Sequence, residues 1–110
     1  MERVELHLAL PERADPDAAD GLLSEEERER AGALLRPADR RAFTVAHALL
    51  RTALSRRRPD VPPSAWTFRT GPAGKPELDG PAVLRFNLTH ADGLVACAVA
   101  GEAEIGRAHV

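Results

Sequence analysis

Residues 37 to 58 carry the longest periodic pattern in the chain, and this pattern most restricts how the chain can fold. Apolar side chains recur there at the spacing of one helix face, and Pro37 suits the first helical position. The apolar positions are Ala42, Phe43, Ala46, Leu49, Leu50, Ala53 and Leu54. The pattern therefore predicts one long helix, which ends in the basic run before Pro59.

Alternating segments on both sides of this helix predict β-strands. Residues 3–10 alternate and predict a half-buried strand, whose apolar side carries Val4, Leu6, Leu8 and Leu10. Residues 66–70 predict a short strand. Residues 83–90 and 93–101 predict two strands joined by an Ala-Asp-Gly turn.

A second, shorter helix is predicted to begin at Ser24. Ser24 and Glu27 have the spacing of a capping box, and Pro37 disfavours a helical conformation at Arg36. This helix is expected to turn Ala31, Leu34 and Leu35 inward, whereas residues 11–21 indicate a loop. The order strand, helix, helix and then several strands predicts an α+β domain, with an antiparallel sheet packed against the long helix.

Size and charge limit the classes of function. The chain has 110 residues and a net charge of −2, so one small domain is expected and no general attraction to nucleic acid. No apolar run is long enough for a membrane span or signal peptide, and a single cysteine, Cys97, is expected to be inert core. Residues 56–58 are basic but lack aromatic neighbours, which favours a solvated helix end. A soluble, cytoplasmic protein without nucleic-acid or membrane partners is expected.

Three segments, in this order and spacing, resemble the N-terminal half of the Sfp-type 4′-phosphopantetheinyl transferases. They are LLRPADRRAFTVAHALLRTALSRRR (34–58), GPAGKPEL (71–78) and FNLTHADGLVACAVA (86–100). In that family a basic helix ends in Leu-Leu-Arg, a Gly-Lys-Pro turn follows, and Phe-Asn-(Leu/Ile)-(Ser/Thr)-His precedes an apolar strand. The resemblance covers roughly residues 20–106 and implies one half of the pseudo-twofold fold of that family.

The Gly-Lys-Pro and Thr-His segments carry the residue types that a phosphate needs. Lys75, the only lysine among fifteen basic residues, lies in a constrained turn before Pro76, and His90 follows Thr89 at a strand end. An ammonium, an imidazole and a hydroxyl at loop ends suit a phosphate or pyrophosphate. The resemblance implies coenzyme A as the ligand, with Lys75 and His90 at its phosphates and Pro76 and Thr89 lining the pocket. Without the surrounding motif, a histidine at a strand end is more often a surface or capping residue.

The basic helical segments offer candidates for the 3′-phosphate of coenzyme A. The resemblance implies Arg30, Arg40 or Arg41, although several arginines crowd this region and only some can point the right way. His47 lies among alanines and leucines, so a partly buried position in the long helix is expected for it.

The family transfers the phosphopantetheine arm of coenzyme A to a serine of a carrier protein. Its Mg²⁺ is held by the carboxylates of a Gly-(Val/Ile)-Asp-(Val/Ile)-Glu run after the apolar strand. Here Ala108 and Val110 stand at the matching positions, and neither side chain can bind a metal. A pair of Glu104 and His109 would lack a third ligand. No metal site and no catalytic residue is therefore expected in this chain.

The break in the motif suggests an aberrant tail. Residues 104–110 match the translation of GAGATCGGAAGAGCACACGTC, the start of a common short-read sequencing adapter. We therefore expect residues 1–104 to be the N-terminal half of a transferase, and residues 105–110 to come from truncation or adapter sequence. A genomic reading frame that encodes Arg-Ala-His-Val and stops would contradict this.

The expected function is that of an inactive fragment of an enzyme that primes acyl or peptidyl carrier proteins. Its partners are expected to be coenzyme A and the carrier protein. Two alternatives remain open: a non-catalytic coenzyme A-binding module, and a protein-interaction domain that binds through an uncovered sheet.

Overall fold

The computed structural model describes residues 3–91 and 93–101 of the chain. The expected aberrant tail, with Ala108 and Val110, lies outside the described residues, as does Asp92 in the predicted turn. The expectation for the tail therefore stays a prediction.

The chain forms an α+β domain with antiparallel sheets and one long helix, as the sequence predicts. The strands are β1 (Val4–Ala9), β2 (Thr67–Thr70), β3 (Pro76–Gly80), β4 (Leu84–Ala91) and β5 (Leu94–Gly101). The α-helices are α1 (Pro16–Leu22), α2 (Glu25–Gly32) and α3 (Pro37–Arg57). Short 3-10 turns occur at Pro11–Arg13 (η1), Pro63–Ala65 (η2) and Pro72–Gly74 (η3).

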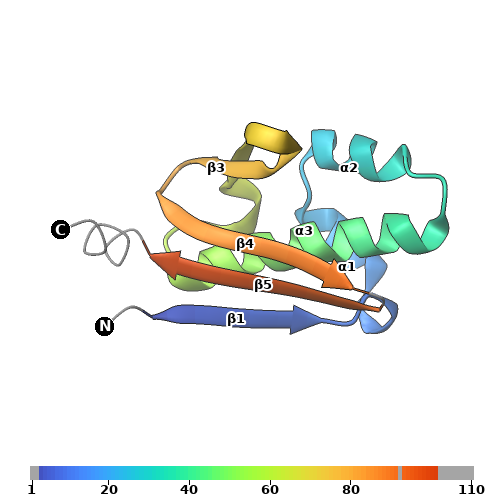
Figure 1. Cartoon of the computed structure of the whole chain (residues 1–110), viewed down its shortest axis with the longest axis horizontal. Coiled ribbons are helices and arrows are strands. Elements are labelled where there is room, and N and C mark those ends of the chain that lie inside the picture. Colours follow the sequence, from blue (N-terminus) through green and yellow to red (C-terminus); the bar gives the residue numbers. More distant parts are fainter. Residues whose placement is uncertain (1–2, 92, 102–110) are drawn as a thin grey trace.

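The strands form two separate antiparallel sheets. The larger has the order β1-β5-β4, and the smaller pairs β2 with β3. Figure 1 shows the three-stranded sheet in front, α3 running behind it, and α2 and β3 on the same side of the sheet as α3.

The core lies between α3 and one face of the three-stranded sheet. The buried side chains there are Leu50, Ala53, Leu54, Val61, Trp66, Leu84, Cys97 and Val99. A second, smaller cluster joins α1 to α3 through Ala19, Leu23, Val45 and Ala48. The helical spacing of apolar residues in α3 is explained by these two contacts.

The strand β1 forms where it was predicted. Its apolar side, which a half-buried strand is expected to turn toward the core, faces outward instead. Val4, Leu6, Leu8 and Leu10 are between 47% and 66% exposed. Glu5 points instead toward α3, where its carboxylate lies 3.4 Å from the Arg57 guanidinium. The physical reason is that α3 covers only one face of the sheet, so the apolar face of β1 has no described layer against it.

Two further local predictions were wrong. Leu35 is not inward but 93% exposed, because α2 ends at Gly32 and the chain turns before α3. The segment read as a loop contains α1, which Asp15 caps by accepting from the backbone N–H groups of Asp17 and Ala18. The strand β3 directly follows Lys75, in a segment for which no strand was predicted.

Within the described residues, none of the helices has the length and apolar character needed to cross a membrane.

Candidate functional site

Glu27 on α2 is a buried carboxylate held by its own helix end. Its Oε1 accepts a hydrogen bond of 2.8 Å from the backbone N–H of Ser24, and Ser24 Oγ accepts one of 3.1 Å from the Glu27 N–H. The predicted capping box is thus confirmed. The side chain is also turned toward α3, so only 7% of the residue is exposed.

Arg51 on α3 is the main counter-charge of Glu27. Its Nε donates to Glu27 Oε1 at 2.9 Å. Its Nη1 donates to the carbonyl oxygens of Pro63 and Trp66, at 2.9 and 2.8 Å. With 2% of the residue exposed, the guanidinium is a buried tie between α2, α3 and the segment that leads into β2.

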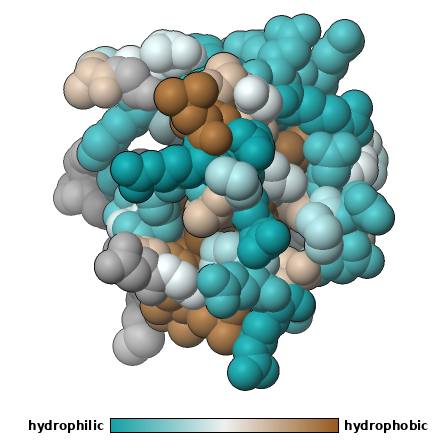
Figure 2. Space-filling model, turned by 90° about the vertical axis from the view of Figure 1, so that its right-hand side faces the viewer, coloured by the Kyte–Doolittle hydropathy of each residue, from teal (hydrophilic) through white to brown (hydrophobic). Residues whose placement is uncertain are grey.

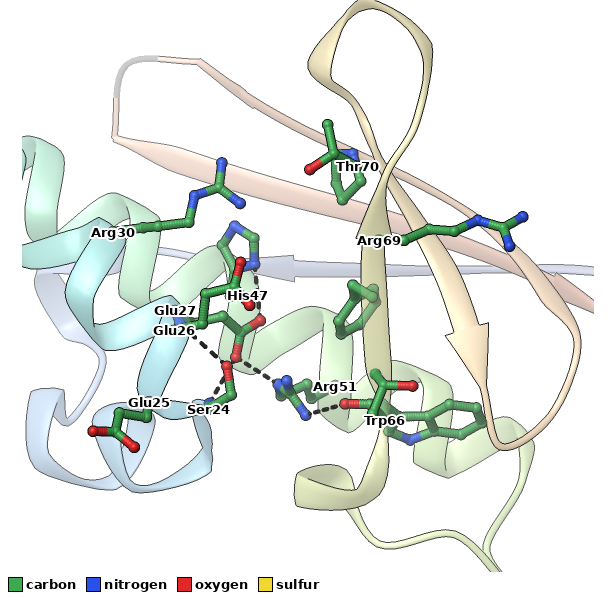
Figure 3. Close-up of a pocket in the computed structure, with 13 residues that line it drawn as sticks. Ser24, Glu25, Glu26, Glu27, Arg30, His47, Arg51, Trp66, Arg69 and Thr70 are labelled. Carbon is green, nitrogen blue, oxygen red and sulfur yellow. Dashed lines mark hydrogen bonds and ion pairs between the residues drawn. The ribbon is translucent and has the colours of Figure 1, made fainter.

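His47 lies one helical turn before Arg51 and contacts the other carboxylate oxygen. Its Nδ1 is 3.3 Å from Glu27 Oε2, an ion-pair separation without the alignment of a full hydrogen bond. The ring stacks on Phe43 at 4.1 Å, and the Arg30 guanidinium lies 5.7 Å from the Phe43 ring centre. Figure 3 shows His47 between Glu27 and Arg30, beside the small sheet.

The electrostatics of Glu27 follow from these contacts. Burial alone would raise the pKa of Glu27, but donors on His47, the Ser24 backbone and Arg51, with the charge of Arg51, outweigh it and lower the pKa to about 2. Glu27 is therefore a fixed anion at neutral pH, and it can orient the cationic and polar groups around it.

Two hollows adjoin at this cluster. The first, called here the Glu27 cleft, has a volume of about 360 Å³ and lies between α2, α3 and β2. The second, called the His90 cleft, has a volume of about 700 Å³ and lies between α3 and the end of β4. Both are lined by Arg30, His47 and Pro76, so these three residues form the wall between them.

The structure brings together three of the residues expected from sequence to bind coenzyme A. Arg30, Pro76 and His90 line the His90 cleft, although they come from α2, β3 and β4. Lys75 directly precedes Pro76 and is exposed, but it lines neither cleft.

The other three candidates lie apart from this group. Thr89 is adjacent to His90 in β4, so its exposed side chain points to the opposite face of the sheet. Arg40 and Arg41 line a separate hollow of about 270 Å³ beside α1. Arg40 also donates to the carbonyl oxygens of Leu34 and Leu35, at 2.7 and 3.1 Å, and thereby closes the turn before α3.

The residues that sequence reasoning missed are Glu27, His47 and Arg51 as one cluster. The signal available for Glu27 was its capping-box position, which accounts for only one of its contacts. His47 was expected to be partly buried in the long helix, and it is, with 12% of its side chain exposed. Their spacing does not reveal that Glu27 reaches from one helix to the next.

The described residues do not fit a metal site. Among residues 3–91 and 93–101, no three His, Cys, Asp or Glu side chains are close enough together to hold an ion. The positions that match the metal-binding carboxylates of the resembled family, Ala108 and Val110, lie outside the described residues.

Comparison with solved structures identifies the fold. A holo-(acyl-carrier-protein) synthase from Bacillus anthracis str. Ames, in complex with CoA (3′,5′-ADP), superimposes with a TM-score of 0.71 at 17% identity, over 89% of this chain and 93% of that chain. The fold is that of a phosphopantetheinyl transferase. The Thermotoga maritima holo-[acyl-carrier-protein] synthase superimposes with a TM-score of 0.67 at 21% identity, over 93% of this chain and 64% of that chain. No protein-family model and no curated protein sequence matches this chain.

Proposed function

We propose that this chain is the coenzyme A-binding part of a 4′-phosphopantetheinyl transferase, which primes an acyl or peptidyl carrier protein. The observation that carries the proposal is the convergence of Arg30, Pro76 and His90 on one cleft. These residues were selected from the sequence motifs alone, and they meet in a fold shared with a synthase crystallised in complex with CoA (3′,5′-ADP).

The chemistry of the His90 cleft suits this ligand. The Arg30 guanidinium and the His90 imidazole can donate charge-assisted hydrogen bonds to phosphate oxygens, each worth about 1.5–3 kcal/mol. Leu34, Ala42 and Leu88 also line the cleft and give it an apolar floor against which a base or the pantetheine arm can pack. Lys75, directly before β3, would reach the ligand from the rim.

We further propose that the chain corresponds to the N-terminal half of an Sfp-type enzyme and transfers no arm by itself. The residues at the family's metal-binding positions are Ala108 and Val110, whose side chains offer no oxygen ligand. The catalytic lysine of the resembled family has no counterpart among the motifs of this chain.

Titration calorimetry with coenzyme A tests the binding proposal. The wild-type chain is expected to bind, and His90→Ala and Lys75→Ala are each expected to bind more weakly, by about tenfold or more. A folded chain with no measurable coenzyme A binding would refute the proposal.

Mass spectrometry of a carrier protein tests the proposed absence of transfer. An apo acyl carrier protein incubated with coenzyme A, Mg²⁺ and this chain is expected to keep its mass. A phosphopantetheine mass gain would show an active transferase. Both an inactive fragment of a transferase and a non-catalytic coenzyme A-binding module would bind coenzyme A without transferring its arm.

The outer face of the three-stranded sheet supports a second candidate function, that of a protein-interaction domain. Leu6 on β1 pairs with Ala98 on β5, and Leu8 pairs with Ala96. Together these side chains make a continuous apolar surface. Figure 2 views the end of the molecule where β1 stops, and hydrophobic surface gathers at the bottom of that view. Such a surface favours association. Light scattering that finds only monomers at high concentration would count against this function.

A further inference from the structure

His47 presents its two ring nitrogens to different surroundings. Nδ1 is buried against Glu27, with 3.3 Å to Oε2. Nε2 has no hydrogen-bond partner among the described residues and is not among their buried polar atoms. Because His47 lines both clefts and Figure 3 shows the ring between Glu27 and Arg30, Nε2 is the nitrogen available to a ligand.

The orientation of the ring is set before any ligand arrives. Phe43, one turn earlier on α3, stacks on it with an interplanar angle of 27°. Glu27 cannot move away, because Ser24 and Arg51 hold its other oxygen. A side chain fixed in this way loses little conformational entropy when it binds a ligand.

The Glu27 carboxylate also influences which of the two ring nitrogens of His47 carries a proton. A carboxylate next to Nδ1 favours a proton on that nitrogen, which leaves Nε2 to share a proton with a phosphate oxygen of a ligand. The same wall carries the Arg30 guanidinium, which forms no ion pair with a described carboxylate and lies 5.7 Å from the Phe43 ring centre. Nε2 of His47 and the N–H donors of Arg30 therefore border the same space.

Acidic side chains limit where an anion can sit. Glu25 and Glu26 line the Glu27 cleft, whereas Asp39 is the single acidic residue among the described residues that line the His90 cleft. The His90 cleft also has His90 itself. Of the other arginines that line the Glu27 cleft, Arg51 is paired with Glu27, and Arg69 lies 3.6 and 3.7 Å from the carboxylates of Glu77 and Asp79. With fewer carboxylates on its lining, the His90 side of the wall therefore suits an anion better.

We propose that His47 is a phosphate-binding residue of the His90 cleft, positioned by Glu27, and that with Arg30 it binds the 3′-phosphate of coenzyme A. The proposal rests on the proposed function, because it names a further contact of the same ligand. It assigns to Glu27 the role of a positioning residue, which acts through His47 and does not touch the ligand.

The variant His47→Asn separates the two nitrogens. Its amide nitrogen can replace Nδ1 as the donor to Glu27, but it has no group at the position of Nε2. We expect a modest loss of stability toward urea from the lost stack on Phe43, an about tenfold loss of affinity for coenzyme A, and no loss for dephospho-coenzyme A, which lacks the 3′-phosphate. Calorimetry with both ligands measures this difference.

His7→Asn is the matched control. His7 is a half-buried histidine on β1 and lines neither cleft, so both affinities are expected to stay at the wild-type value. Equal affinity of His47→Asn and wild type for coenzyme A would overturn the inference but not the proposed function. An equal loss for both ligands would also overturn it, and a wild-type chain that binds no coenzyme A would refute both.

A measurement on the wild-type chain covers the case in which His47→Asn does not fold. In a long-range ¹H–¹⁵N spectrum of the histidine side chains, His47 Nε2 is expected to shift with coenzyme A and much less with dephospho-coenzyme A. The same shift with both ligands would contradict a contact with the 3′-phosphate.

Discussion

Arg51 Nε on α3 lies 2.9 Å from Glu27 Oε1 on α2, and both side chains are withdrawn from solvent. This pair joins the two helices behind the clefts, and the carbonyl contacts of Arg51 extend the connection to the segment before β2. A buried ion pair contributes little over a well-packed apolar pair, but the loss of one partner is costly. Much of the stability of the region behind the two clefts therefore depends on this one pair.

Replacement of Arg51 by methionine is expected to destabilise the fold strongly. The variant leaves Glu27 charged and buried, and it removes the donors to the carbonyl oxygens of Pro63 and Trp66. Such a loss costs about 3–5 kcal/mol of unfolding free energy. Urea denaturation followed by circular dichroism measures it.

The control for this variant is Arg58→Met. Arg58 forms an ion pair of 2.9 Å with Asp60 in solvent, and exposed pairs contribute little. Its urea midpoint is expected to stay close to that of the wild type. Similar midpoints for Arg51→Met and Arg58→Met would contradict a structural role for the buried pair.

Acid is expected to destabilise the chain through Glu27. Its pKa is lowered from 4.5 to about 2 in the folded state, so its contribution is complete above pH 4.5 and is lost as the pH falls toward 2. At about 1.4 kcal/mol per pKa unit, the loss is on the order of 3 kcal/mol. Urea titrations between pH 7 and 2 measure it.

Glu27→Gln tests the origin of this acid dependence. The variant is less stable at neutral pH but lacks the titrating carboxyl, so its stability is expected to fall less steeply between pH 4.5 and 2. Parallel curves for wild type and Glu27→Gln would assign the effect to other carboxyl groups.

Arg30 and Arg41 are expected to differ in their effect on coenzyme A binding. Arg30 lines the His90 cleft, whereas Arg41 lines the hollow beside α1, together with Asp17 and Asp20. Arg30→Ala is expected to weaken binding by about tenfold or more, and Arg41→Ala to leave it nearly unchanged. Calorimetry that ranks the two variants in the opposite order would place the ligand at the hollow beside α1.

Cys97 is expected to resist alkylation in the folded chain. It is buried in β5, and burial raises the pKa of its thiol to about 11, so little reactive thiolate forms near neutral pH. Iodoacetamide at pH 8 should modify it only after urea is added. Rapid modification without urea would show that the core between α3 and β5 opens readily.

The elements found from the sequence are those whose signals are local. The apolar spacing of residues 37–58 and the capping box at Ser24 depend on side chains within a turn or two of one another, and both were confirmed. The helix α1 was missed although Asp15 and Pro16 are good starting residues, because its seven residues are too few to repeat an apolar pattern. Local signals of this strength do not distinguish a short helix from a loop.

The sequence by itself determined that β1 has an apolar and a polar face, but only the tertiary structure decided which face is covered. Alternation has the same period whichever side a helix packs on, and α3 covers the side of Glu5 and His7. The same limit applies to Thr89 and His90, which are neighbours in one motif and lie on opposite faces of the sheet.

The sequence also supplied the residue types of the candidate site, whereas the fold selected among them. Arg30 and His90 meet across the domain because α2 and β4 flank the same end of α3, and Arg41 points elsewhere on that helix. The contact of Glu27 with His47 joins positions on different helices. Such a contact depends on how two helices pack, and neither helix encodes that packing alone.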